Sequence, residues 1–498
     1  MTARNDTVGT VRAVRLAGPG REFLIDDEPV DLHLDGGVIV DIAPTGALRP
    51  RGQVLDADGL WAVPGLWDNH VHTVQWALAA ERVPLHDTTS AAEAALRMGE
   101  APTLPDGRRV GTGFRDALWP DRPSLELLDA TTGAAPTYLI NADVHSVWLN
   151  TAALAREGFR ADDGVLREED AFEISRRLNA VDPAHSDEAV LRAGEAAAAR
   201  GVTGLVDFDM AWNAAAWPRR VRAGFASHRV EFAFYPADLD RAVTEGLRSG
   251  EPHEEPDTPA EARGLIRVGS LKIITDGSLG TRTAACSHAY PDDPGNYGVL
   301  TVPGDELVAL LTTATGAGIT AAVHAIGDRA VTSALDAFMV TGATGSLEHA
   351  QLVRHADLAR FARLGVIASV QPQHAVDDRD FVEHHWAGQT SLGYPLSSLF
   401  AAGAEVRFGS DAPVAPLDPW QALSAAVWRT DDERESWHPE ERLTVDQALS
   451  ASVRSTLRPG EIADIALTSA DPRTADAAAL RAMPVAATLL AGRVTHVG

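Results

Sequence analysis

Lysine is almost absent from this sequence, and cysteine is equally scarce. Among its 43 basic residues the only lysine is Lys272, and the only cysteine is Cys286. A single cysteine excludes an internal disulfide framework and is compatible with a reducing compartment. A general shortage of lysine is typical of a GC-rich genome, but that bias does not decide where the remaining lysine lies. The position of Lys272 is therefore informative.

The chain also lacks an excess of positive charge and long apolar runs. Its formal net charge is −27, so a nucleic acid or an anionic membrane surface would be repelled, and no basic patch offsets this charge. The first ten residues, Met1–Thr10, are polar, and no run approaches the length of a membrane span. We therefore expect a cytoplasmic protein without nucleic-acid or membrane partners.

Both ends of the chain carry short strand patterns. Val30–Leu34 and Val38–Ile42 flank the residues Asp35-Gly36-Gly37, which are typical of a hairpin. Three more segments near the carboxyl end read as strands: Ile462–Thr468, Val485–Leu490 and Val494–Val497. Because neither end has enough strands to bury a face alone, we expect residues 1–61 and 456–498 to form one small β-sandwich domain.

Between these ends the chain repeats a helix, a glycine and a short apolar strand. Ser186 caps a predicted helix through Arg200, and Gly201 ends it before the next strand. Eight segments read as buried strands: Ala62–Trp67, Val202–Phe208, Val230–Tyr235, Val268–Ile274, Ile319–His324, Gly345–His349, Val366–Gln371 and Glu405–Phe408. Eight parallel strands alternating with helices form a TIM-type (β/α)8 barrel. The predicted α/β barrel spans residues 62–455.

A long segment from about residue 73 to residue 179 interrupts this repeat after the first strand. It is far longer than an ordinary connection between a strand and a helix. Trp119, Tyr138, Trp148 and the strand-like Thr137–Asn141 favour a structured insertion over a disordered linker. We expect this insertion to act as a lid or specificity region.

Side chains that bind metals lie at the ends of the predicted strands. His70 and His72 are two apart on the first strand and point the same way, so both can bind one metal ion. Four other strands contribute Lys272, His324, His349 and Asp411. A satisfied core histidine or a turn aspartate explains each of them alone, but barrel geometry makes them converge at one mouth. The pattern therefore predicts a metal centre.

Lys272 has a chemical property that arginine lacks. A protonated ammonium cannot bind a metal, but a buried neutral amine can react with carbon dioxide to give a carbamate that bridges two cations. In a chain that otherwise uses arginine, a surface cation at this position could also be arginine. We therefore predict that Lys272 is carbamylated.

The order of these motifs resembles that of the amidohydrolase superfamily in its binuclear form. Within it, four segments are similar to the amidohydrolase 3 (YtcJ-like) family: Leu271–Ala284, His324–Ala330, Glu348–Gln351 and Gly409–Val414. The similarity extends over nearly the whole chain and includes Asp143–Asn150 and Leu457–Asp464. The resemblance implies the same two-part architecture and hydrolysis of a carbon–nitrogen bond in a small molecule.

The resemblance also implies a role for each candidate ligand. His70, His72 and Asp411 would bind one divalent ion, and His324 and His349 would bind a second. Carbamylated Lys272 and a hydroxide would bridge the two ions, for which zinc is expected and manganese or iron are alternatives. Asp411 would take the proton of the attacking hydroxide and pass it to the leaving nitrogen of an amide-type bond.

Substrate contacts are predicted for His145, Trp148, Arg282 and His374. Each has a structural interpretation as well, since Trp148 suits a core and Arg282 suits an internal ion pair. Gln351 is a candidate for orienting His349. The sequence leaves open whether the chain forms a homo-oligomer.

Three other functions stay open. A lactone or ester hydrolase would use the same hydroxide. A deaminase of the same superfamily is expected to use one metal, no lysine, and a glutamate where this chain has Gly327. A non-catalytic scaffold is the third alternative, although the complete ligand set argues against it.

Overall fold

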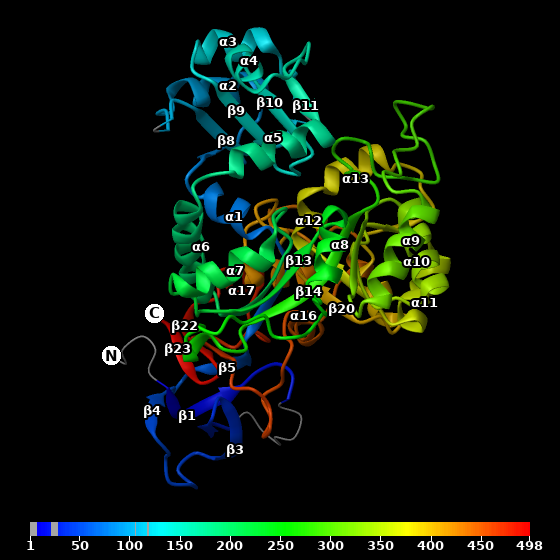
Figure 1. Cartoon of the computed structure of the whole chain (residues 1–498). Coiled ribbons are helices and arrows are strands. Elements are labelled where there is room, and N and C mark those ends of the chain that lie inside the picture. The colour runs from blue at the N-terminus through cyan, green and yellow to red at the C-terminus, as the bar shows by residue number, and fades with distance from the viewer. Residues whose placement is uncertain (1–6, 21–27, 105, 117–118) are drawn as a thin grey trace.

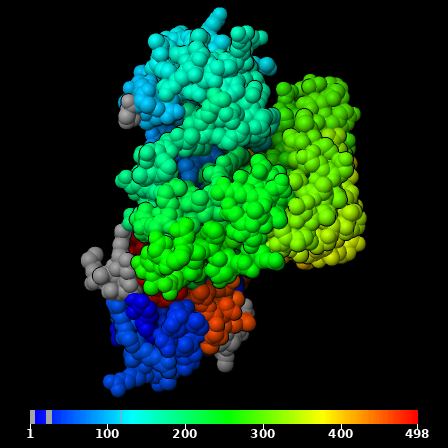
Figure 2. Space-filling view, viewed as in Figure 1, coloured from blue at the N-terminus to red at the C-terminus, as the bar shows by residue number. Residues whose placement is uncertain are grey.

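Figure 1 shows a computed structural model of the chain, in which an α/β barrel lies between two additional β-sheets. The structure describes residues 7–20, 28–104, 106–116 and 119–498. Residues 1–6 of the predicted polar start and residues 21–27 of the predicted terminal domain lie outside this range. In Figure 2 the insertion stands above one end of the barrel, and the sheet built from the amino-terminal segment lies at the opposite end.

The central element is an eight-stranded parallel sheet that curls into a nearly closed barrel. Its strands are β6 (Leu66–Val71), β12 (Val202–Asp207), β13 (Arg229–Phe234), β14 (Ile266–Ile274), β15 (Ala321–Ala325), β16 (Gly345–His349), β18 (Val366–Val370) and β20 (Val406–Phe408). The first and last strands meet just beyond β20, where the Asp411 amide donates to the His70 carbonyl over 2.7 Å and Ala412 bridges Val71. The predicted barrel is confirmed.

The predicted first strand, Ala62–Trp67, is in fact two strands. β5 (Trp61–Pro64) pairs with β1 (Val8–Leu16) and β21 (Ile465–Thr468) in the terminal sheet, and the barrel strand β6 begins only at Leu66. Gly65 lies between them and packs so closely that an added Cβ would lie 2.2 Å from the Thr203 hydroxyl. The apolar run therefore contributes strands to two sheets. The apolar pattern is continuous, so it gave no sign of the boundary between the two strands.

Helices surround the barrel (Figure 1). They are α1 (Thr73–Ala79), α6 (Pro183–Ala198), α7 (Asn213–Arg222), α8 (Leu239–Thr244), α9 (Gly304–Gly316), α10 (Asp328–Thr341), α11 (His355–Leu364), α12 (Pro372–Asp377), α13 (Arg379–His385), α14 (Leu396–Ala401), α15 (Pro419–Trp428), α16 (Val445–Ala451) and α17 (Ala477–Arg481). The short strands β17 (Leu352–Val353) and β19 (Leu392–Gly393) pair with each other. No helix within the described ranges is long and apolar enough to cross a membrane.

Helix α6 begins three residues before the predicted cap, Ser186. The Asp182 carboxylate accepts from the Ala184 amide over 2.8 Å, and Pro183 occupies the first turn, where its missing N–H is harmless. Gly201 follows the helix with φ of +84°, a conformation that glycine adopts without strain. The helix ends at Ala198, two residues before the predicted end at Arg200, and it begins earlier than predicted.

The insertion forms a domain-like layer with its own core. Its sheet has the order β11 (Val165–Arg167), β10 (Ser146–Leu149), β9 (Thr137–Asn141), β8 (Arg109–Phe114) and β7 (Val83–Pro84). Four helices accompany it: α2 (Ala91–Glu100), α3 (Leu125–Thr132), α4 (Thr151–Glu157) and α5 (Glu169–Asn179). Since α1 packs against α6 in the barrel wall, the separate sheet begins at Val83, later than residue 73.

Both ends of the chain build the second additional sheet. Its order is β23 (Arg493–Val497), β22 (Val485–Leu490), β21, β5, β1, β2 (Val30–Asp35) and β3 (Val38–Pro44), with β4 (Gln53–Asp56) also paired to β1. Val11, Leu32, Ile465 and Leu489 are fully buried in its shared core. Because β5 belongs to this sheet, we propose a domain limit near Gly65 in place of residue 61.

Candidate metal centre

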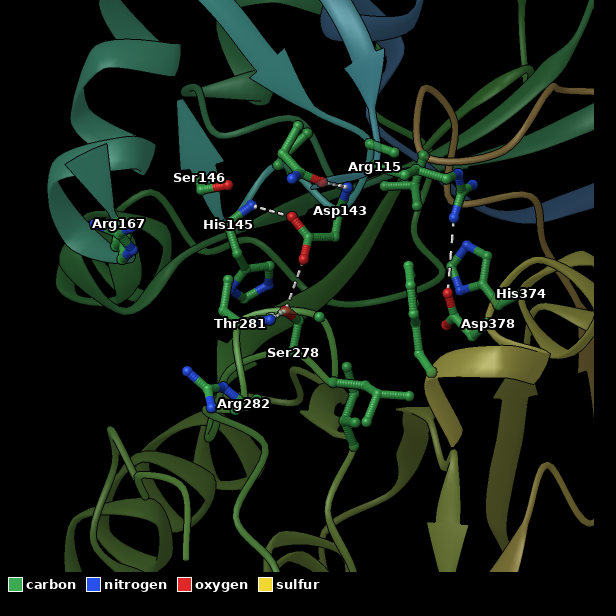
Figure 3. A pocket seen from close by; sticks show the side chains of 18 of the residues that line it. Arg115, Asp143, His145, Ser146, Arg167, Ser278, Thr281, Arg282, His374 and Asp378 are labelled. Carbon is green, nitrogen blue, oxygen red and sulfur yellow. Dashed lines mark hydrogen bonds and ion pairs between the residues drawn. The ribbon is translucent and has the colours of Figure 1, made fainter. Parts of the chain in front are cut away.

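A cavity of about 570 Å³ opens at the carboxyl ends of the barrel strands. The barrel forms one wall, and residues of the insertion, including His145 and Ser146, form the other (Figure 3). All six candidate ligands line this cavity: His70, His72, Lys272, His324, His349 and Asp411. Their side chains come from five strands or strand ends, as predicted for a barrel of this kind.

The Asp411 carboxylate lies at the middle of this group. Its Oδ1 is 3.4 Å from the Nε2 atoms of both His70 and His72. Its Oδ2 is 4.0 Å from His349 Nδ1 and from His374 Nε2. Although burial alone would raise its pKa, the nearby histidines His70, His72 and His349 hold the pKa of Asp411 well below its usual range. Asp411 is therefore an anion shared by two groups of imidazoles.

Asp68 fixes Asp411 and His70 relative to each other. Its Oδ1 accepts from the His70 amide over 3.0 Å and from the Ser410 amide over 2.9 Å. Gly409 allows the close approach, because an added Cβ would lie 2.6 Å from the His70 nitrogen. Burial raises the pKa of Asp68 to about 6. The first aspartate of the motif thus joins the first and last barrel strands.

Lys272 lies in β14 with its amine enclosed by the barrel. Its Nζ is 3.2 Å from His70 Nε2 and 4.3 Å from the centre of the Phe208 ring. The residue is only 2% exposed, and this burial lowers the pKa of the amine to about 8. A substantial neutral fraction is therefore present near pH 8, and only that form reacts with carbon dioxide.

Two buried side chains orient the histidines from behind. Glu348 Oε2 lies 2.6 Å from His70 Nδ1. Gln371 Oε1 lies 2.9 Å from His349 Nδ1, whereas Gln351, which was predicted to orient this histidine, has a buried amide oxygen without a partner in the described part of the chain. Such contacts fix the ring orientation of ligand histidines. Gln371 directly follows β18. Because β18 pairs with β16 in parallel, Gln371 lies beside His349 at the end of β16.

His324 is held at the end of β15 beside a buried carboxylate. Its Nε2 lies 3.4 Å from Asp276 Oδ1, and its ring centre is 4.5 Å from that of His349. Asp276 accepts from the backbone amides of Ala285, Ile326 and Gly327 at 2.9, 3.0 and 2.9 Å, respectively. The fourth-strand loop and the fifth strand are therefore joined through Asp276.

The donor set fits a bound cation. Two groups of three ligand atoms lie close enough to hold an ion, and both include Asp411: His70 with His72, and His349 with His374. His324 and Lys272 belong to neither group but lie against them. The Nε2 atom of His374 is buried and has no hydrogen bond within the described residues, and the buried Nε2 of His324 has only the Asp276 carboxylate, at 3.4 Å. Buried orphan nitrogens are costly, and a metal ion would give them a partner.

The predicted substrate contacts divide into two kinds. His145, Arg282 and His374 line the cavity, and His374 lies nearer to Asp411 than a peripheral contact would. Trp148 is fully buried in the core of the insertion, and its indole nitrogen donates to the Ser124 carbonyl over 3.2 Å. The prediction for Trp148 was wrong, because large aromatic residues in a small domain are needed for its core.

His145 is held by a residue that sequence reasoning missed. Its Nδ1 lies 2.9 Å from Glu168 Oε2, and Glu168 also accepts from Thr281 and Thr283 at 3.0 and 2.7 Å. Although burial lowers it, the pKa of His145 is raised by this carboxylate. In Figure 3 Asp143 bonds Ser278 across the same gap, at 2.8 Å. These contacts tie the insertion to the fourth-strand loop.

The roles of Glu348 and Asp276 were also missed, although both residues lie within segments that carry the resemblance. The sequence shows that a carboxylate lies beside a candidate ligand. Which side chain that carboxylate contacts depends on the strand that packs next to it. Glu168 has no local signal, since its partner Thr281 is 113 residues away. A contact between residues so far apart in the sequence can be seen only in the folded chain.

Comparison with known proteins decides the family. A family model described as "Amidohydrolase family" matches residues 53–496. The chain belongs to the amidohydrolase family. It is 25% identical over 522 residues to YtcJ of Bacillus subtilis (strain 168), which covers 94% of this chain and 96% of that protein.

Other relatives of this amidohydrolase extend the comparison. Protein LONG AFTER FAR-RED 3 of Arabidopsis thaliana is 27% identical over 83% of this chain and 79% of its own length. N-substituted formamide deformylase of Arthrobacter pascens is 25% identical over 90% of each chain. The fold matches that of a metal-dependent hydrolase of Pyrococcus horikoshii, with a TM-score of 0.77, 24% identity and coverage of 94% of this chain and 99% of that one.

Proposed function

We propose that this chain is a binuclear metal-dependent hydrolase that cleaves an amide-type carbon–nitrogen bond in a small molecule. Family membership and the candidate ligand groups make it a metal-dependent hydrolase. The observation that carries the finer proposal is the Asp411 carboxylate, whose two oxygens face two separate groups of histidines. A carboxylate in that position can serve a pair of ions.

The proposed ligands divide as the resemblance to the binuclear amidohydrolases implies. His70, His72 and Asp411 would hold one ion, and His324 and His349 would hold the other. Carbamylated Lys272 would serve both, since its Nζ already lies beside His70. The group held there would be two divalent cations, which we propose to be zinc because of the nitrogen and oxygen donors, and their chemistry would be that of a Lewis acid that activates water.

Asp411 is the proposed proton carrier. It is a buried anion beside His70 and His72, and an ionised carboxylate in that position can accept a proton from the attacking water. The same oxygen can then pass that proton to the leaving nitrogen. Asp68 and the His70 carbonyl hold the Asp411 segment in place for both transfers.

The substrate class is proposed from the cavity and one relative. A volume of about 570 Å³ suits a small molecule rather than a folded protein. The similarity to N-substituted formamide deformylase supports an N-acyl amine as substrate. His145 and Arg282 line the cavity and are proposed to contact the acyl or amine group.

A deaminase is disfavoured by the backbone at Gly327. An added Cβ there would lie 2.1 Å from the Ala285 carbonyl oxygen, so no glutamate fits at this position without moving the fourth-strand loop. The glutamate that a deaminase is expected to use as a proton donor therefore has no room at this position.

The test uses a panel of N-formyl and N-acetyl amines with matched esters, assayed with the zinc-loaded protein. We expect amide hydrolysis, and the variant Asp411→Asn should lower kcat by roughly 10²–10⁴-fold because it removes the proton carrier. Asp257→Asn, an exposed change outside the cavity, is the control. Ester hydrolysis without amide hydrolysis, or an unimpaired Asp411→Asn variant, would contradict the proposal.

A further inference from the structure

A third group of metal-binding side chains lies at the rim of the cavity. It consists of Asp292, His384 and His385, whose ligand atoms all lie within 4.8 Å of one another. All three residues line the same cavity as the candidate metal centre, yet none belongs to the groups that share Asp411. The proposed hydrolysis assigns them no role.

We propose that Asp292, His384 and His385 bind a further zinc-type divalent cation at the mouth of the cavity. Two imidazoles and one carboxylate are a donor set that zinc accepts, and three protein ligands leave a coordination position open to solvent or to a substrate group. The set differs from an acidic surface cluster because two of its three donors are neutral nitrogens, which discriminate against calcium and magnesium.

The geometry of this rim group is prepared by its surroundings. His384 Nε2 already lies 2.8 Å from Asp292 Oδ2, although both side chains are about half exposed, at 51% and 57%. His385 is only 7% exposed, its ring packs against those of Tyr290 and His384, and no hydrogen bond to it is found within the described residues. A largely buried imidazole whose ring nitrogens are free of hydrogen bonds to the described residues, beside an exposed histidine and carboxylate, is suited to an ion that arrives from solvent.

The two segments that carry the group are joined to each other. Asp292 lies in a turn closed by the Asp293 amide, which donates to the Tyr290 carbonyl over 3.0 Å. Tyr290 is buried, its hydroxyl donates to the Ala284 carbonyl over 3.0 Å, and its ring packs edge-on against His385 with 6.2 Å between the ring centres. The turn therefore holds the carboxylate beside the end of α13.

The charges around the rim group determine how tightly it is expected to bind a cation. His385 lies near enough to Arg282 for the positive charge of that guanidinium to act on the rim group. The same Arg282 charge opposes a cation, and only one carboxylate in the group offsets it. We therefore expect the rim ion to exchange readily, whereas an ion at the buried centre would be retained through dialysis. An ion at the rim narrows the entrance, so it should raise KM for substrates.

The experiment is a calorimetric titration with Zn²⁺ of protein that was first loaded with zinc and dialysed. The wild type should bind one further equivalent. His384→Ala and Asp292→Asn, both changes at exposed positions, should weaken that equivalent at least tenfold and leave the dialysis-resistant metal content unchanged. His288→Ala, an exposed histidine of the same loop outside the cavity lining, is the matched control and should titrate as the wild type does.

Absence of a further equivalent in the wild type would overturn the proposal. The same conclusion follows if His384→Ala and Asp292→Asn bind zinc as tightly as the wild type. The metal retained through dialysis reports separately on the buried centre. A retained metal content other than two equivalents per chain would therefore contradict the binuclear function. It would not count against the rim site.

Discussion

Glu348 shows how much of the centre depends on single side chains behind the candidate ligands. It is 1% exposed, and its carboxylate contacts both His70 and the Ser346 hydroxyl. Burial raises its pKa above the usual range, while the Lys272 charge lowers it. Glu348 and Lys272 contact opposite nitrogens of the His70 ring, and the charge of each affects the pKa of the other.

We expect Glu348→Gln to weaken zinc binding by roughly 10–100-fold, because the amide cannot hold the His70 Nδ1 proton as a carboxylate does. The measurement is the zinc concentration that restores half of the activity after chelation. Glu435→Gln, an exposed change, should restore as the wild type does. Equal zinc requirements in both variants would show that Glu348 does not tune the ligand.

Lys272→Arg tests the carbamate directly. Arginine keeps the positive charge but cannot form a carbamate, so the retained metal should fall from about two equivalents to one or fewer, with loss of amide hydrolysis. Elemental analysis per chain gives the number. Two equivalents retained by a folded Lys272→Arg variant would mean that Lys272 does not bridge the ions, and would favour the one-metal or non-catalytic alternatives.

At the scale of elements, the turns that follow the strands decide where the side chains lie. The turn after β15 carries Gly327, which packs against the Ala285 carbonyl and donates its amide to Asp276. This contact joins the start of α10 to the fourth-strand loop. The sequence marks the position as a glycine, but its neighbour is 42 residues earlier in the chain.

Gly327→Ala should destabilise the protein by about 1–3 kcal/mol or more, because the methyl group overlaps a backbone carbonyl. Gly316→Ala in α9 is the matched control: nothing lies within 4 Å of its added Cβ, and it should stabilise by up to about 0.5–1 kcal/mol. Thermal unfolding of both variants measures this difference. A Gly327→Ala midpoint equal to that of Gly316→Ala would refute the steric argument.

At the scale of the whole molecule, the two ends of the chain complete one sheet. β21 pairs with β5, and β5 pairs with β1, so the carboxyl-terminal segment covers strand edges and core residues of the amino-terminal one. Thr488 also donates to the Ala198 carbonyl at the end of α6 over 2.7 Å. The terminal sheet therefore also braces the barrel.

A chain that ends at residue 455 should lose cooperative unfolding and be recovered mostly as aggregate, because β5 becomes an open edge and an apolar core is exposed. Soluble yield and thermal unfolding measure this outcome. Val497→Ser, an exposed change in β23, should behave as the full chain does. A soluble, cooperatively unfolding truncated chain would show that the barrel is independent of the sheet.

The sequence by itself determined the repeating pattern of the barrel, the hairpin near the amino terminus and the residue types at the strand ends. These are local properties, set by apolar periodicity and by turn residues within a few positions. The family followed from the same local motifs. His70, His72, Lys272, His324, His349 and Asp411 could be named in this way, because barrel topology brings strand ends together whatever the details of packing.

Only the tertiary structure decided which atoms face one another. It divided Ala62–Trp67 between two sheets, put Trp148 into a core, moved His374 beside Asp411 and gave His349 the partner Gln371 in place of Gln351. It also brought Asp292 to His384, which is 92 residues away. These outcomes depend on register, strand order and close packing, and no local pattern records which distant segment fills a given space.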